Sequence, residues 1–214
     1  MATPKKIWLY RITHIDNLPY ILKIGLHTRQ SDLFDPNYIN IGDTTLIDYR
    51  ESLNVCNPPG GKLAEYIPFY LGPRSPMLYQ IATGFEDIVK YNQAELIYLI
   101  SSYDQVINHK LEYFFTDVNA RVSTANYYTS KIDFDKLDWS TIYSTYWRSD
   151  ETDLQRKQKK QAEFLIKEYL PISCIEYIGV YNEEAKQRIL FLLEQEKIEL
   201  KIRVSPEKLY YDNL

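Results

Sequence analysis

The sequence is poor in cysteine, histidine and glycine, and each shortage argues against a class of protein. Its 214 residues include 2 cysteines, 3 histidines and 7 glycines. Two cysteines cannot build a disulfide framework, which indicates a reducing compartment such as the cytoplasm. The histidines are too few for a multi-histidine metal site, so we expect no metal.

Several sequence signatures are also missing. There is no glycine-rich phosphate loop, no HExxH and no CxxC. Cys56 and Cys174 lie far apart and neither follows a helix-start signal, so a cysteine nucleophile is not favoured. No apolar run reaches the roughly 18 residues of a membrane span, and residues 1–6 lack the apolar segment of a signal peptide.

The charge and the apolar content describe a folded, mildly acidic chain. Lys and Arg total 25 against 29 Asp and Glu, giving a net charge of -4. This balance argues against a globally basic nucleic-acid-binding protein, and 45% hydrophobic residues argue against disorder. The length predicts a single domain over residues 1–214. The 20 tyrosines suit half-buried strands, clefts and stacking surfaces.

Strand and helix patterns follow one another without regular alternation, which predicts an α+β fold. The first unit indicates a strand, then a helix that Asp16 or Asn17 caps and Gly25 ends. Pro68 predicts that its strand is an edge strand or carries a bulge. We expect strands near 7–13, 66–71, 96–100, 113–116, 175–181 and 200–204, and helices near 18–24, 75–79, 139–147 and 183–193.

Two short segments carry residue patterns that suit a site. In a strand, Arg11 and Thr13 share one face, which suits either ligand binding or a solvated edge strand. The same alternation would place Gln161 and Glu163 on one face. A carboxylate at the mouth of an apolar strand can stabilise a cationic transition state. A solvated helix face is the alternative, and the pattern alone does not separate the two.

A run of cations precedes Glu163, interspersed with acidic residues. It forms either a solvated face or a local patch that contacts nucleic-acid phosphates, with aromatic residues nearby to stack on bases. The cations are Arg148, Arg156, Lys157, Lys159 and Lys160, and the aromatic residues are Tyr146 and Trp147.

Six segments together resemble the DarT family, toxins that ADP-ribosylate DNA. They are YRITHIDNL (10–18), GKLAEYIPFY (61–70), PRSPMLY (73–79), FTD (115–117), LDW (137–139) and KKQAEFL (159–165). They span nearly the whole chain in the order and spacing of the family, and the match is closest to the thymidine-modifying branch.

The resemblance implies an ADP-ribosyltransferase fold, in which a split mixed β-sheet with flanking helices surrounds an NAD cleft. It implies NAD as the substrate that donates ADP-ribose, a thymidine base in single-stranded DNA as the acceptor, and the macrodomain antitoxin DarG as a partner. The alternatives are the same chemistry on guanine in DNA or on RNA, hydrolysis of NAD by water, and a non-catalytic nucleotide-binding module of this fold.

The resemblance also assigns residues. The family's catalytic glutamate falls on Glu163, and its functional arginine, which deals with the proton of thymine N3, falls on Arg50. Many relatives have histidine where this chain has Arg11. The residues implied for NAD are Arg11, Thr13, His14, Asn17, Gly25, Leu26, Tyr70 and Met77, and those for DNA are Tyr146, Arg148, Lys157, Lys160 and Gln161.

Overall fold

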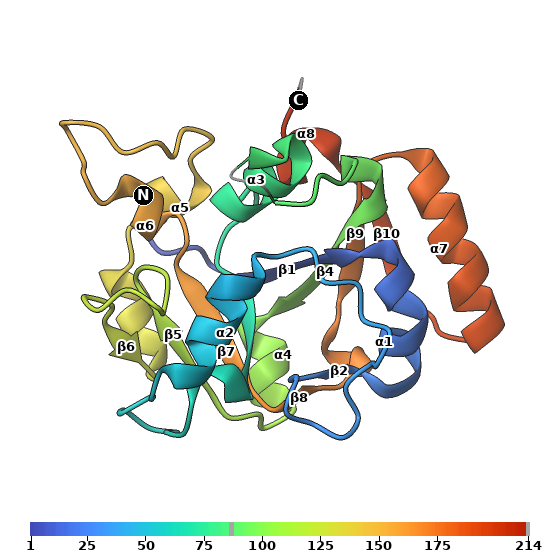
Figure 1. Cartoon of the computed structure of the whole chain (residues 1–214), viewed down its shortest axis with the longest axis horizontal. Coiled ribbons are helices and arrows are strands. Elements are labelled where there is room, and N and C mark those ends of the chain that lie inside the picture. Colours follow the sequence, from blue (N-terminus) through green and yellow to red (C-terminus); the bar gives the residue numbers. More distant parts are fainter. Residues whose placement is uncertain (86–87, 213–214) are drawn as a thin grey trace.

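The chain folds around one large β-sheet (Figure 1). The computed structural model describes residues 1–85 and 88–212. The strands in these ranges are β1 (Trp8–His14), β2 (Leu26–His27), β3 (Tyr66–Tyr70), β4 (Leu96–Ser102), β5 (Tyr113–Thr116), β6 (Tyr127–Tyr128), β7 (Glu163–Lys167), β8 (Tyr169–Leu170), β9 (Tyr177–Val180) and β10 (Lys201–Val204). Eight of these described strands form the sheet, in the order β10-β9-β4-β1-β3-β7-β5-β6, and β2 pairs with β8. Only β9 and β10 pair in parallel, so within the described residues the sheet is mixed.

The described strand pairs of this sheet are antiparallel except β9–β10, and helices and strands do not alternate regularly, so the predicted α+β class is confirmed. Helices cover both faces of the sheet. Helices α1, α4, α5 and α7 pack on one face, while α3 and α8 pack on the other. The α-helices in the described ranges are α1 (Leu18–Ile24), α2 (Thr44–Ser52), α3 (Pro76–Thr83), α4 (Tyr103–Asn108), α5 (Trp139–Tyr143), α6 (Arg156–Lys159), α7 (Glu183–Glu196) and α8 (Pro206–Leu209). None of these described helices is long and apolar enough to cross a membrane. The expected single domain stays a prediction.

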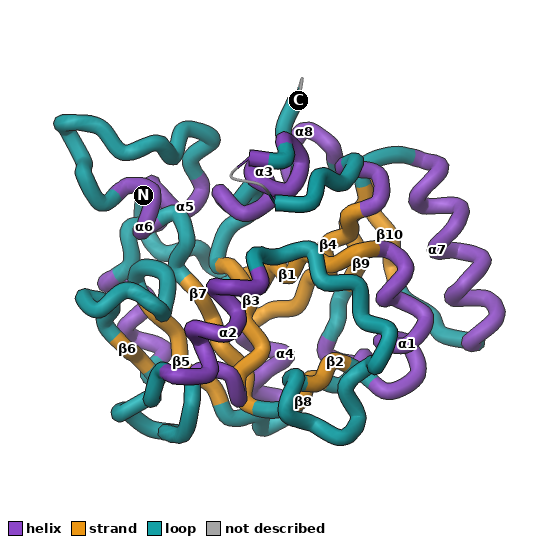
Figure 2. The backbone as a smooth tube through the Cα atoms, viewed as in Figure 1, coloured by secondary structure: helices purple, strands orange, loops and turns teal. Residues whose placement is uncertain are grey.

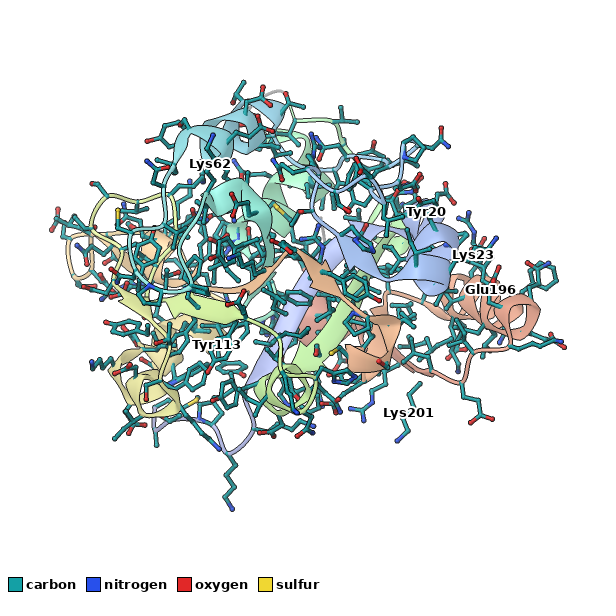
Figure 3. All side chains as sticks on the ribbon, turned by 90° about the horizontal axis from the view of Figure 1, so that it is seen from below. Tyr20, Lys23, Lys62, Tyr113, Glu196 and Lys201 are labelled. Carbon is teal, nitrogen blue, oxygen red and sulfur yellow. The ribbon has the colours of Figure 1, made fainter. Side chains whose placement is uncertain are left out.

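The strand interiors follow the predicted alternation. Leu9 of β1 faces the core on the side of α1 and α7, whereas Tyr10 faces the core on the side of α3. Every residue of β4 is buried, which confirms the buried strand predicted at 96–100. At the β9–β10 end, α1 and α7 lie side by side, and Lys23 Nζ is 3.4 Å from Glu196 Oε1 (Figure 3).

The sheet opens between β1 and β3. β1 pairs with β4 along its whole length, but it pairs with β3 only at Tyr10 and Tyr70. The side chain of Arg11 crosses the opening, and its Nη1 donates to the carbonyl oxygen of Pro68 at 3.0 Å. In a strand, the N–H and the C=O of one residue point to the same side. The carbonyl oxygen of Pro68 faces the opening, so the backbone N–H that proline lacks would have faced the opening as well. The prediction of an edge strand is therefore wrong, because β3 lies between β1 and β7 and Pro68 marks the split.

The first strand–helix unit is close to the prediction. Asn17 occupies the N-cap of α1 with proline in the first turn, although its side chain does not cap the helix. Gly25 ends the helix with φ 86°, a value that favours glycine.

The helix predicted over 139–147 is too long. Helix α5 ends at Tyr143, and the segment from there to α6 is loop (Figure 2). Ser144 has extended backbone, and its hydroxyl donates to the carbonyl oxygen of Tyr146, a local bond that competes with helix. Trp147 packs edge-on against Tyr79 of α3, with ring centroids 5.6 Å apart.

Candidate functional site

A cavity of about 250 Å³ brings together side chains from both sides of the split in the sheet. Its wall includes six residues predicted for the site, from β1, α2, β3, α3 and the start of β7. They are Arg11, Arg50, Tyr70, Met77, Gln161 and Glu163. The loop between β2 and α2, which runs from 28 to 43 (Figure 2), forms much of the remaining wall.

Glu163 is the buried carboxylate of this cavity, at 3% exposed. It opens β7 and lies opposite Tyr70 of β3, so the segment is a strand and not the alternative helix. The backbone N–H of Ala120 donates to its Oε2 at 3.0 Å, and Asn119 Nδ2 donates to its Oε1 at 3.3 Å. These donors hold the carboxylate in one orientation, as a site that stabilises developing charge requires.

Arg50 approaches Glu163 from α2. Its Nη1 lies 3.4 Å from Glu163 Oε1 and 3.5 Å from Oε2, and its side chain is 14% exposed. The Nη2 atom is buried and has no hydrogen-bond partner among the described residues. An unpaired buried donor is costly, which indicates that a ligand accepts this hydrogen bond.

On the other side of the opening, Arg11 and Tyr70 supply polar groups to a largely apolar wall. The Nε of Arg11 is buried without a partner in the described part of the chain. The hydroxyl of Tyr70 donates to the Sδ of Met77 at 3.6 Å. Burial, and then the negative charge of Glu163, raise the pKa of Tyr70 above its usual value, so its hydroxyl remains a donor.

Thr13, His14 and Asn17, which the resemblance assigns to NAD, do not line this cavity. The side chain of Asn17 donates to Thr13 Oγ1 and to the carbonyl oxygen of Ile39, and it accepts from the N–H of Ile39. Thr13 Oγ1 also lies 3.1 Å from the hydroxyl of Tyr38. Through these bonds, Thr13 and Asn17 hold the loop that forms the cavity wall. His14 Nδ1 accepts from the N–H of Asp16.

Gly25 and Leu26 also lie outside the wall. A Cβ at position 25 would lie 2.6 Å from the carbonyl oxygen of Leu170, so only glycine fits between α1 and β8. Leu26 is buried and pairs with Leu170. This turn carries the chain to His27 and Thr28, which do line the cavity.

The cations predicted to contact DNA have different surroundings. Lys160 is 1% exposed, and its Nζ donates to the carbonyl oxygen of Ile142 at 2.6 Å. The prediction that Lys160 contacts DNA is therefore wrong, because its amine points into the protein. Arg148, Lys157 and Tyr146 are exposed, and Arg148 and Lys157 have no ion pair with any described residue.

The remaining cations of that run are largely neutralised. Arg156 pairs with Asp150 and also stacks over the ring of Tyr146, 5.1 Å from its centroid. Lys159 Nζ lies 3.0 Å from Asp153 Oδ2. Only part of the predicted basic patch is therefore available to a ligand.

Asn119, Ala120 and Arg121 are site residues that the sequence analysis did not find. They belong to the loop between β5 and β6, and the first two bind Glu163 while Arg121 lines the cavity. Turn residues after the strand at 113–116 were the available signal. A turn pattern does not say which distant side chain its residues will meet.

Comparisons with known proteins identify the family of this chain. A family model described as ssDNA thymidine ADP-ribosyltransferase, DarT, matches residues 10–211. A DNA ADP-ribosyl transferase of Escherichia coli O127:H6 is 36% identical over 199 residues, which cover 93% of this chain and 91% of the relative. A DNA ADP-ribosyl transferase of Thermus sp. (strain 2.9) is 37% identical over 194 residues, covering 90% of each protein.

Solved structures of the Thermus sp. 2.9 DarT have the same fold. The complex with ADP-ribosylated ssDNA superposes with a TM-score of 0.90 at 32% identity, covering 98% of this chain and 99% of the other. The complex with NAD+ superposes with a TM-score of 0.84 at 31% identity, covering 97% and 99%. The predicted ADP-ribosyltransferase fold is thereby confirmed, and the chain belongs to the DarT family of single-stranded DNA thymidine ADP-ribosyltransferases.

Proposed function

We propose that Glu163 and Arg50 carry out the reaction of this family in this chain, the transfer of ADP-ribose from NAD+ to a thymidine base in single-stranded DNA. The observation that carries the proposal is the buried Glu163 carboxylate, oriented by Asn119 and Ala120, with the guanidinium of Arg50 beside it in one cavity. The Thermus complexes with NAD+ and with ADP-ribosylated ssDNA support the choice of both substrates.

In this proposal Glu163 stabilises the ribosyl cation. The bond from the anomeric carbon to the nicotinamide nitrogen breaks, and nicotinamide leaves as a neutral ring with the bonding electrons. The carboxylate then faces a positive oxocarbenium ion and accepts a hydrogen bond from the ribose 2′-hydroxyl. Its fixed donors keep it aligned, so no reorganisation is needed as the charge develops.

Arg50 acts on the acceptor base. Thymine N3 must lose its proton, which passes to water, so that its electron pair can form the new bond to the anomeric carbon. A guanidinium stays protonated in proteins, so Arg50 stabilises the deprotonated base and does not accept the proton. The buried Nη2, without a partner among the described residues, is the donor available for this contact.

We assign the binding of NAD+ to the side of the cavity that holds Arg11, Tyr70 and Met77. The buried Nε of Arg11, without a partner among the described residues, is a donor for the substrate. Thr13 and Asn17 support this side indirectly, because they anchor the loop that carries Tyr38.

Replacement of the carboxylate tests the assignment of Glu163. We expect Glu163→Gln to lower the rate of label transfer from NAD+ to a thymidine-containing oligonucleotide by about 10²- to 10³-fold, since it removes the charge that stabilises the transition state. Glu184→Gln, on the exposed surface of α7, is the control and should leave the rate unchanged. Undiminished transfer by the Glu163 variant would show that another group carries the reaction.

The same assay separates the alternative acceptors. Thymidine-free DNA and RNA oligonucleotides should receive no label, and nicotinamide release should depend on added thymidine-containing strand. Label on guanine-containing strands alone would contradict the proposed acceptor, and DNA-independent release would indicate hydrolysis of NAD+.

We propose a DarG-type macrodomain antitoxin as the partner of this chain, acting in the cytoplasm. A relative from Thermosipho africanus is a DNA ADP-ribosyl transferase-DNA ADP-ribosyl glycohydrolase fusion protein, 27% identical over 183 residues. A DarG-type glycohydrolase should remove the label from an oligonucleotide that this chain has modified. Label that resists this treatment would contradict the pairing.

A further inference from the structure

Arg121 presents an unused guanidinium edge to the cavity. Its Nε and its backbone N–H both donate to Asn119 Oδ1, at 3.0 and 3.1 Å. Across the described part of the chain, no hydrogen bond or ion pair engages its two terminal nitrogens, although the residue lines the cavity. One edge of the guanidinium is therefore anchored, while the other is open to a ligand.

Hydrogen bonds through Asn119 connect the anchored edge of Arg121 to Glu163. Because Arg121 supplies two donors, the Asn119 atom that faces it must be the amide oxygen. The amide nitrogen therefore points the other way, where it donates to Glu163 Oε1 at 3.3 Å. Asn119 is 5% exposed, so burial also restricts this side chain. Arg121, Asn119 and Glu163 form a continuous hydrogen-bonded chain from the cavity wall to the proposed catalytic carboxylate.

Arg121 and Arg11 lie on opposite sides of Glu163. The strand order β1-β3-β7-β5 puts Arg11 on β1, Glu163 on β7 and Arg121 after β5. The Arg11 side is the one we assign to NAD+. The acceptor strand must then approach from the side of the β5–β6 loop, where Arg121 is placed to meet its backbone.

We propose that Arg121 binds a phosphodiester of the acceptor DNA strand and, through Asn119, couples that contact to the position of the Glu163 carboxylate. The proposal rests on the proposed function for its choice of acceptor. A guanidinium edge suits phosphate because two parallel N–H donors match two phosphate oxygens. Arg121 is then both a binding residue for DNA and a positioning residue for Glu163.

Binding of a fluorescein-labelled, thymidine-containing oligonucleotide tests the phosphate contact without any turnover. We expect Arg121→Gln to weaken binding at least about tenfold. It should also reduce the slope of log affinity against log salt by about 0.7, the value for one phosphate of a single strand. Arg121→Lys keeps the charge, so it should retain the slope. Arg188→Gln is the control, because α7 and β6 lie at opposite ends of the molecule (Figure 1), and it should match the parent.

Steady-state kinetics test the coupling to Glu163. They also show whether the phosphate that Arg121 binds belongs to the DNA strand or to NAD+. Arg121→Gln should raise KM for the oligonucleotide but not for NAD+. Both variants should lower kcat, because neither has the guanidinium Nε–H that donates to Asn119, and only the backbone N–H of residue 121 then holds that side chain. Arg121→Lys should restore the KM for the oligonucleotide but not kcat.

Several results would overturn the proposal. An unchanged salt slope in Arg121→Gln would exclude the phosphate contact, and a rise in KM for NAD+ alone would move the contact to the pyrophosphate of NAD+. A parent-like kcat in both variants would exclude the coupling. A parent chain that shows the expected binding and salt slope but transfers no label would instead contradict the proposed function.

Discussion

Lys160 shows how a lysine side chain can position its neighbours from inside the protein. Its amine donates to the carbonyl oxygen of Ile142, at the end of α5. A Cβ at Gly72 would lie 2.4 Å from the same oxygen, so the segment after β3, α5 and the segment before β7 meet closely at this point. The bond ties the chain just ahead of Glu163 to α5, and we infer that Lys160 positions that carboxylate rather than binding a ligand.

Burial of this amine makes stability depend on pH. Burial, and then the positive charge of Arg74, lower the pKa of Lys160 to about 7. In the unfolded chain the pKa of lysine is about 10.4, so between these values the unfolded state binds more protons. The free energy of unfolding of the parent, minus that of Lys160→Met, should therefore rise by roughly 1.4 kcal/mol per pH unit between pH 7 and pH 10.

Urea unfolding of the parent and of Lys160→Met between pH 6 and pH 9 measures this difference. Groups that the two proteins share cancel when one curve is subtracted from the other. Below pH 7 the difference should level off, because the amine is then charged in both states. A flat difference over the whole range would contradict the lowered pKa.

Among the elements, helix α2 has little support from packing, although it carries Arg50. None of its residues is buried, and it lacks the apolar stripe that would have predicted it from sequence. Its start depends on Asp43, whose Oδ1 accepts from the N–H of Thr45 at 2.8 Å and from the N–H of Leu46 at 3.4 Å. Helices without a buried face derive little stability from tertiary contacts, so this cap matters more than usual.

Loss of the cap should loosen α2. We expect Asp43→Ala to cost about 1 kcal/mol of local stability and to speed amide hydrogen exchange in α2. Asp43→Asn also removes the charge but keeps a capping oxygen, so it should retain the protection. Equal exchange in the alanine and asparagine variants would show that the cap does not stabilise the helix.

Across the whole molecule, the distribution of charged and aromatic residues matters more than their totals. The cavity wall holds four arginines, Arg11, Arg29, Arg50 and Arg121, and three carboxylates, Asp43, Glu51 and Glu163. It is therefore locally positive in a chain whose net charge is -4. A negative total therefore does not exclude nucleic acid, since binding of one strand in one cleft depends on the local charge. Five of the 20 tyrosines are buried, among them Tyr98, which packs edge-on against Tyr10 and Tyr210. Most of the others are half-buried, as the sequence predicted.

The sequence by itself determined the local structure and the family. Residue periodicity and turn residues predicted the first strand–helix unit, the glycine stop at Gly25 and the buried strand β4, because burial and backbone preference act over neighbouring residues. The pattern left Glu163 between strand and helix, and only the ordered family motifs singled it out.

The tertiary structure decided which residues meet. Asn119 and Arg50 reach Glu163 from 44 and 113 residues away along the chain, and no local pattern encodes such contacts. The sequence placed Lys160 among surface cations, but in the structure its amine is buried and donates to the carbonyl oxygen of Ile142. Local preferences decide each segment's conformation, whereas the site is assembled by the long-range pairing of β7 with β3 on one side and β5 on the other.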